Sequence, residues 1–182
     1  GAAVNVRDEL GMLQVGRDIQ AGAAVAAGWT RSVRIGGNLM GQVRFDRFCT
    51  TIVTVNVAGD IGGDLAIKAD SNVSIGGGVL DGGTIDLGGD VRSFTTTGPV
   101  AGDILVDGGV SSMRLGSMNG AVLTTGFDLT TLQVSGDVGN SLIQVGVSRG
   151  ADSVFGSADV GETGRRGQIG SLNIGGALSG SV

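Results

Sequence analysis

Aspartate and asparagine side chains recur along the chain and are its most evident candidates for binding chemistry. Five of them hold one place in a pattern that returns about every 20 residues: Asp18, Asn38, Asp60, Asp137 and Asp159. Such side chains favour tight corners, because their oxygens accept hydrogen bonds from nearby backbone N–H groups. Stacked corner oxygens also suit Ca²⁺, which takes roughly six to eight oxygen ligands. We expect the corner role and no cofactor, with Ca²⁺ at the Asp-bearing corners as the alternative.

Carboxylate pairs raise the question of catalysis. Asp60 with Asp64, or Asp86 with Asp90, would supply the acid and the base for cutting a polysaccharide. However, the chain has no histidine, which rules out a Ser–His–Asp or Cys–His site, and aromatic residues, which stack on sugars, make up only 3%. We therefore expect no catalytic, cofactor-binding or metal-binding residue and no enzymatic activity. A polysaccharide-binding or polysaccharide-cleaving protein is the alternative.

Four aromatic and arginine residues form a second candidate site. Trp29 and Arg31 lie close to the same place in one repeat as Arg47 and Phe48 do in the next. One corner of the folded chain would bring them together, and aromatic residues with arginine dominate many binding interfaces. We expect a contact patch of Trp29, Arg31, Arg47 and Phe48. Alternatively, they cover one end of the fold or pack beneath a neighbouring domain.

The overall composition excludes several classes of protein. The net charge is −5, and the basic residues are scattered apart from Arg165 and Arg166, so we expect no nucleic-acid partner. No apolar run approaches the roughly 20 residues that span a bilayer. The opening residues, GAAV, lack the basic and apolar regions of a signal peptide, which predicts a mature or excised segment. The single cysteine, Cys49, excludes an internal disulfide.

A sequence repeat positions all of these side chains. Residues 32–43 read SVRIGGNLMGQV and residues 171–182 read SLNIGGALSGSV. Their shared template is small polar, apolar, any, apolar, Gly, Gly, any, apolar, any, Gly, any, apolar. The template recurs with starts at Met12, Ser32, Thr54, Asn72, Ser93, Ser112, Thr131, Ser153 and Ser171. Its second and eighth positions are apolar in every copy, which predicts two buried columns.

The repeat predicts its own local structure. Alternation such as Val33-Arg34-Ile35 is typical of a strand with one buried face. The paired glycines that follow predict a tight corner at unusual φ angles, where a Cβ would clash. A second short strand comes next, as in Val43-Arg44-Phe45, and no segment has the length or period of a helix. Such a unit buries its apolar face only by stacking on its neighbours.

The sequence therefore predicts an all-β fold: a single right-handed parallel β-helix, or β-solenoid, of about nine coils of ~20 residues, with no helices of note. Equivalent residues would stack about 4.8 Å apart, and the hand follows the usual chirality of parallel crossovers. We expect one domain over residues 1–182 with both ends in mid-coil, either a fragment of a longer solenoid or a unit that stacks end to end. The polar residues 161–170 are expected to form a loop that bulges from the rod.

The copies SVRIGGNLMGQV and TLQVSGDVGNSL resemble the Gly-rich repeats of secreted parallel β-helix proteins. They are similar to those of autotransporter passenger domains and filamentous-haemagglutinin-like adhesins of Gram-negative bacteria. The resemblance implies an extracellular or cell-surface rod, used for adhesion or as a spacer, and carries over no catalytic residue. We expect a non-catalytic structural or adhesive scaffold that self-associates, end to end or laterally, or that contacts neighbouring domains of a longer chain or surface glycans.

Overall fold

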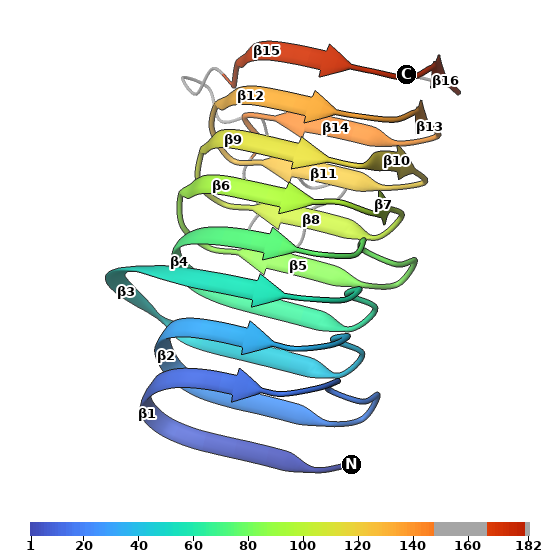
Figure 1. The fold of residues 1–182 in the computed structure, drawn as a ribbon. Coiled ribbons are helices and arrows are strands. Elements are labelled where there is room, and N and C mark those ends of the chain that lie inside the picture. The colour runs from blue at the N-terminus through green and yellow to red at the C-terminus, as the bar shows by residue number, and fades with distance from the viewer. Residues whose placement is uncertain (148–166, 181–182) are drawn as a thin grey trace.

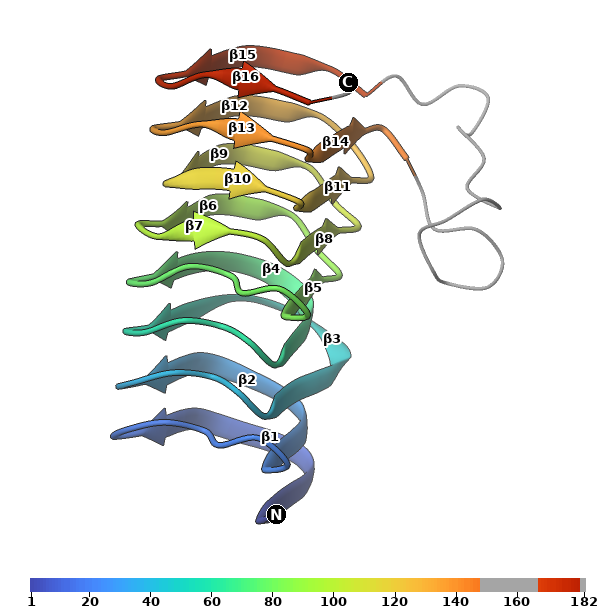
Figure 2. The ribbon, with the colours of Figure 1, turned by 90° about the vertical axis from the view of Figure 1, so that its right-hand side faces the viewer.

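The computed structural model describes residues 1–147 and 167–180, and within them every regular element is a strand. The chain winds as a right-handed coil of about seven turns, with the coils stacked along one axis (Figures 1 and 2). Neighbouring coils pair in parallel along the whole stack. The predicted all-β parallel solenoid is confirmed. The same residues contain no helix long and apolar enough to cross a membrane.

The strands change in length along the rod. The first four are long and bend round a corner: β1 (Ala3–Val15), β2 (Ala24–Ile35), β3 (Gln42–Val57) and β4 (Asp64–Ile75). The later ones are short: β5 (Thr84–Leu87), β6 (Val91–Thr96), β7 (Pro99–Val100), β8 (Asp103–Val106), β9 (Val110–Leu115), β10 (Ser117–Asn119), β11 (Val122–Thr125), β12 (Leu129–Val134), β13 (Val138–Gly139), β14 (Leu142–Val145), β15 (Ile169–Ile174) and β16 (Leu178–Ser179). Glycines such as Gly88, Gly89 and Gly108 occupy the later corners, and glycine interrupts a strand because it has no side chain to pack.

Each coil has three faces. Face A consists of the second halves of β1 to β4 followed by β6, β9, β12 and β15. Face B consists of the paired residues Ile19, Leu39, Ile61 and Val79 followed by β7, β10, β13 and β16. Face C consists of the first halves of β1 to β4 followed by β5, β8, β11 and β14. We name the corners AB, BC and CA after the faces that they join in chain order.

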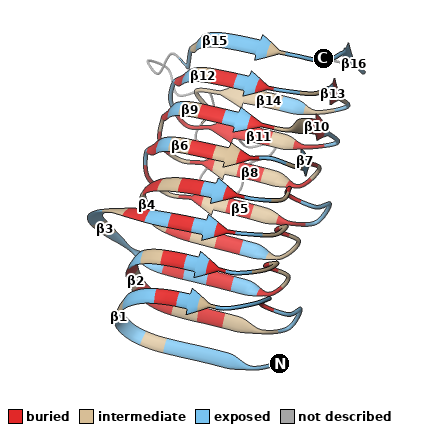
Figure 3. Ribbon diagram, viewed as in Figure 1, coloured by how far each residue is buried: buried red, intermediate tan, exposed pale blue. Residues whose placement is uncertain are grey.

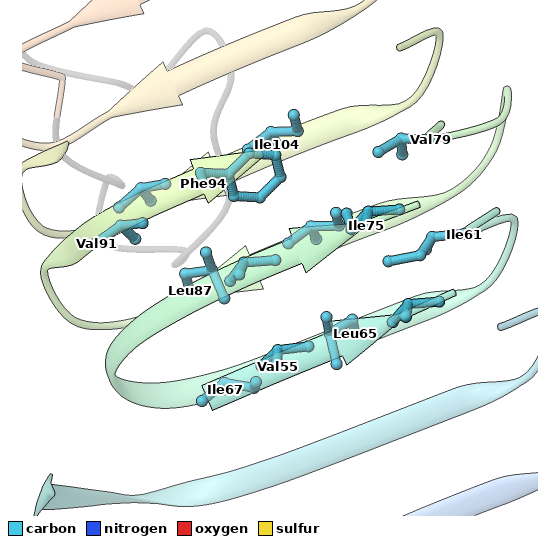
Figure 4. Packing of buried hydrophobic residues seen from close by; sticks show 14 of the residues in the cluster. Val55, Ile61, Leu65, Ile67, Ile75, Val79, Leu87, Val91, Phe94 and Ile104 are labelled. Carbon is cyan, nitrogen blue, oxygen red and sulfur yellow. The ribbon is translucent and has the colours of Figure 1, made fainter. Parts of the chain in front are cut away.

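Apolar side chains from all three faces fill the interior, and the strands alternate between buried and exposed residues (Figure 3). The second template position forms one inward column: Leu13, Val33, Val55, Val73, Phe94, Met113, Leu132 and Leu172. The eighth forms another: Ile19, Leu39, Ile61, Val79, Val100, Met118, Val138 and Leu178. Figure 4 shows Val55, Ile61 and Leu65 pointing inward from three faces. Full burial of one such side chain contributes about 1.5–3 kcal/mol, so the predicted columns form the core.

The predicted number of nine coils is wrong. The template copy at Ser153 lies outside the described residues, and the strands on either side of it pair directly. Leu132 on β12 is in register with Leu172 on β15, and the N–H of Leu129 donates to the Gln168 carbonyl at 2.9 Å. A parallel ladder has room for one strand at each level, so no coil separates the copies that start at Thr131 and Ser171.

The polar loop predicted over residues 161–170 is only partly described. Residues 161–166 lie outside the described part of the chain. Ile169 and Gly170, by contrast, belong to β15 on face A, because the ladder pairs Ile169 with Leu129. The predicted loop therefore extended two residues too far toward the C-terminus.

The paired glycines of the template are required for a different physical reason from the one predicted. Positive φ angles occur not at Gly36 or Gly37 but in other corners, for example 78° at Gly82. A Cβ at Gly36 would instead overlap the carbonyl oxygen of Gly16 in the preceding coil. The template glycines are needed because neighbouring coils approach closely, while the backbone itself is not strained.

Candidate functional site

The aspartates and asparagines of the template line corner AB and bind the next coil. The Oδ1 atom of Asp18 accepts a hydrogen bond from the N–H of Asn38 at 2.7 Å. The side chain of Asn38 does the same for Asp60 at 2.8 Å, and that of Asp60 for Gly78 at 2.8 Å. Asp137 accepts from Ala177 at 2.7 Å. We call these four side chains the AB ladder. The predicted corner role holds, but the partner is the following coil rather than the residue's own turn.

Glycine makes room for each of these hydrogen bonds. The residue before each donating N–H is Gly37, Gly59, Gly77 or Gly176. A Cβ at any of these positions would overlap the Oδ1 atom that reaches over it from the preceding coil. The glycine and the Asx residue of the repeat are therefore two parts of one inter-coil contact. Asp159, the fifth predicted member, lies outside the described residues.

A second ladder of aspartates runs along corner CA and was not predicted. The Oδ1 atom of Asp70 accepts from the N–H of Asp90 at 2.9 Å, and that of Asp90 accepts from Gly109 at 2.8 Å. Asp128 accepts from Gln168 at 3.0 Å. The spacing from Asp70 to Asp90, and then across two repeats to Asp128, was the signal in the sequence that could have revealed this CA ladder.

A groove of about 570 Å³ lies along corner CA, beside the CA ladder. Its lining includes Asp90, Arg92, Gly109, Phe127 and Asp128. Gly109 stands at the ladder position between Asp90 and Asp128, where it has no side chain to continue the row. The groove is therefore lined by carboxylates on either side of that gap, together with an arginine and an aromatic ring.

The carboxylate pairs considered for acid–base chemistry are used separately. Asp60 belongs to corner AB, whereas Asp64 begins β4 on face C and accepts a hydrogen bond from Gln42 at 3.0 Å. Asp86 lies on β5 and pairs with Lys68 at 3.5 Å, whereas Asp90 belongs to the CA ladder. The structure thus assigns each member of both pairs to a different face or corner of the rod.

Lys68 connects three successive coils. Its ammonium group lies 3.5 Å from Asp86 and 3.8 Å from Asp107, one and two coils further along. All three side chains are partly buried. The only lysine of the chain is therefore a cross-link along the rod. For the described residues, no group of three or more His, Cys, Asp or Glu side chains is arranged to hold a metal ion.

The predicted contact patch lies at corner CA of the first coils. The guanidinium of Arg31 lies 5.7 Å from the centre of the Trp29 ring and 3.3 Å from Glu9. Phe48, in the next coil, is 66% exposed. The structure therefore places Trp29, Arg31 and Phe48 on the same corner.

Arg47, the fourth residue of the predicted patch, turns toward the N-terminal coil. It reaches across Gly28 to bind Asp8 at 2.7 Å, and a Cβ at Gly28 would lie 3.2 Å from its Cδ. Both arginines of the patch are therefore ion-paired to the first coil. The charge available for a partner at this corner is correspondingly reduced.

The last described coil carries an apolar hollow of about 460 Å³. Leu142, Leu172 and Leu178 are exposed there, and Ile143 and Ile174 line its floor. In every earlier coil the equivalent side chains are covered by the next one. The hollow is thus a surface of the same composition as the core.

The description of the fold and of these surfaces is derived from this chain alone. Comparisons with protein-family models, with curated proteins and with solved structures found no match. The resemblance to autotransporter passenger domains and filamentous-haemagglutinin-like adhesins is supported only as far as the parallel β-solenoid arrangement.

Proposed function

We propose that this chain is a non-catalytic structural segment of a secreted or cell-surface protein. It acts as a rigid scaffold or adhesive spacer, and it self-associates through the end faces of its coils. The extracellular location and the adhesive role follow the resemblance of its repeats to surface adhesins. The rigid-rod role has a physical basis in the contacts between coils.

The observation that carries the proposal is the continuity of those contacts along the axis. Each coil is joined to the next by backbone hydrogen bonds and by the buried apolar columns, and at several steps the side-chain oxygens of the AB and CA ladders add further hydrogen bonds. Every hydrogen bond contributes a net ~0.5–1.5 kcal/mol. Because the two ladders lie on different corners, they resist both separation and rotation of neighbouring coils, which is what a stiff spacer needs.

The apolar hollow on the last described coil supports self-association. An unpaired parallel edge is a template for a further strand, and burial of the three exposed leucines would contribute apolar surface in addition. The first coil of a second copy presents Val4, which is exposed and in register with the buried Val25 on face C. A second copy stacked end to end would continue both the sheet and the core.

Light scattering over a concentration series, with negative-stain microscopy of the same samples, tests this proposal. We expect rods that lengthen with concentration. Leu172→Asp should abolish them, because it places a charge in the hollow, whereas Asn56→Asp adds the same charge to exposed face A and should leave them unchanged. Monodisperse particles of 18.0 kDa at every concentration would contradict end-to-end association.

A further inference from the structure

The groove at corner CA opens where the CA ladder loses a side chain. Asp70 binds the N–H of Asp90, and Asp90 binds that of Gly109. Gly109 has no oxygen to offer the next residue of the row, Asp128. Within the described residues, the N–H of Asp128 consequently has no acceptor. A hydrogen-bond donor is left facing the space that an aspartate at position 109 would fill.

The two carboxylates beside this space are already fixed in place. Asp90 and Asp128 each commit Oδ1 to the next coil, which holds the carboxylates rigid and leaves Oδ2 as a second acceptor. Arg92 is exposed and forms no ion pair within the part of the chain that the structure describes. A ligand that binds here would meet two preorganised carboxylates and a backbone donor, so that Arg92 would be the main side chain to be ordered on binding.

Phe127 gives the groove an apolar side. It is 43% exposed, and within the described residues it and Phe48 are the two aromatic residues among the exposed large hydrophobic side chains. Phe127 lines the groove beside Asp128 and Thr130. An aromatic surface beside hydroxyl, carboxylate and guanidinium groups suits a ligand with an apolar face and a polar edge, since binding sites combine apolar contact with a few polar groups.

We infer that this groove binds a neutral saccharide. The Oδ2 atoms of Asp90 and Asp128 accept hydrogen bonds from sugar hydroxyls, and the Asp128 N–H and the Arg92 guanidinium donate to sugar oxygens. The Phe127 ring packs against the C–H face of a sugar ring. Anionic sugars are disfavoured, because Asp70, Asp90 and Asp128 outnumber the single arginine. The inference goes beyond the scaffold role and uses residues remote from the coil ends, so either proposal can fail without the other.

Isothermal titration calorimetry of the whole chain against cellohexaose, xylohexaose and maltohexaose tests the inference. We expect at least one of them to bind, with an affinity that does not change between low and high salt. Phe127→Ala should weaken binding about threefold to tenfold, which is the loss of one aromatic contact. Phe48→Ala removes the exposed aromatic residue of the predicted contact patch and should leave binding unchanged.

Gly109→Asp is the decisive variant. It completes the row of aspartates, gives the N–H of Asp128 an acceptor and fills the space, so binding should be lost while the melting temperature stays the same or rises. The nearest atom to a Cβ at Gly109 is the Asp128 carbonyl oxygen, 3.3 Å away, so the change requires that oxygen to shift by only a few tenths of an ångström. The inference is overturned if none of the three hexaoses binds, or if both variants bind like the wild type. Salt-sensitive binding of spermine with no sugar binding would equally overturn it and would mark the groove as a cation site.

Discussion

The AB and CA ladders are built from the same type of hydrogen bond, in which a backbone N–H donates to a side-chain oxygen of the preceding coil. The two corners differ in what surrounds these bonds. Each ladder has a position without a side chain, at Gly78 in corner AB and at Gly109 in corner CA. The residue opposite Gly78 in the next coil is Pro99, which has no N–H and needs no acceptor. The residue opposite Gly109 is Asp128, whose N–H is left without one among the described residues. At Gly78, corner AB therefore needs no further acceptor, whereas at Gly109 corner CA leaves one donor without a partner among the described residues.

Replacing a glycine by alanine is expected to give the largest difference in stability between the two corners. Gly59→Ala should lower the stability by about 2–4 kcal/mol, because its Cβ would overlap the Asn38 Oδ1 atom and displace the hydrogen bond to Asp60. Gly109→Ala should cost less than about 1 kcal/mol, because the nearest atom to its Cβ, at 3.3 Å, has to shift by only a few tenths of an ångström. Urea unfolding followed by circular dichroism measures both. Equal effects would contradict the view that corner AB is packed more tightly.

The next largest effect isolates the hydrogen bond of the AB ladder. Asp60→Ala should cost about 1–3 kcal/mol, because it leaves the N–H of Gly78 without its acceptor. Asp60→Asn keeps an oxygen at the same place, as Asn38 does one coil earlier, and should cost less than about 0.5 kcal/mol. The two melting temperatures, measured under one condition, give the comparison. An equal loss in both variants would mean that the charge matters rather than the hydrogen bond.

A substitution in the interior of corner CA is expected to raise the stability rather than lower it. The hydroxyl of Ser71 is fully buried and has no hydrogen-bond partner among the described residues. Its neighbours in the same column are Val53 and Val91. Ser71→Val should therefore raise the stability by about 1 kcal/mol, since it removes an unsatisfied polar group and extends an apolar column. A lower melting temperature in this variant would indicate that the hydroxyl has a partner or that the site has no room.

Much of the fold could be predicted from the sequence because every repeat places apolar residues at the same template positions. Val33, Leu39 and their equivalents recur at fixed positions, and the stacking of coils turns such a recurrence directly into buried columns. The predicted number of coils was wrong because the template copy at Ser153 was counted as a coil. The spacing of template copies does not show which strands pair. Backbone hydrogen bonds between Leu129 and Gln168 decide that question, and they join residues almost two repeats apart.

The surfaces were harder to predict than the core. Asp18 and Asp60 were placed in corners correctly, but the reach of their side chains to the next coil depends on the distance between coils, which no local pattern encodes. The CA groove depends on an absence, the missing side chain at Gly109, and on residues such as Arg92 and Phe127 that come from different repeats. Trp29 and Arg31 lie together because they are near neighbours in sequence, and their role as a contact patch stays a prediction.

The smallest expected effect separates surface ion pairs from the ladders. Arg47→Ala removes the 2.7 Å contact with Asp8, but both side chains are mostly exposed, at 62% and 78%. Solvent screening limits such a pair to about 0–1 kcal/mol, so the melting temperature should fall far less than in Asp60→Ala. The contact spans two coils at the same corner as the CA ladder, and high salt should erase what little it contributes. A loss as large as that of Asp60→Ala, insensitive to salt, would mean that the Arg47 stem stabilises the rod by packing over Gly28 rather than by its charge.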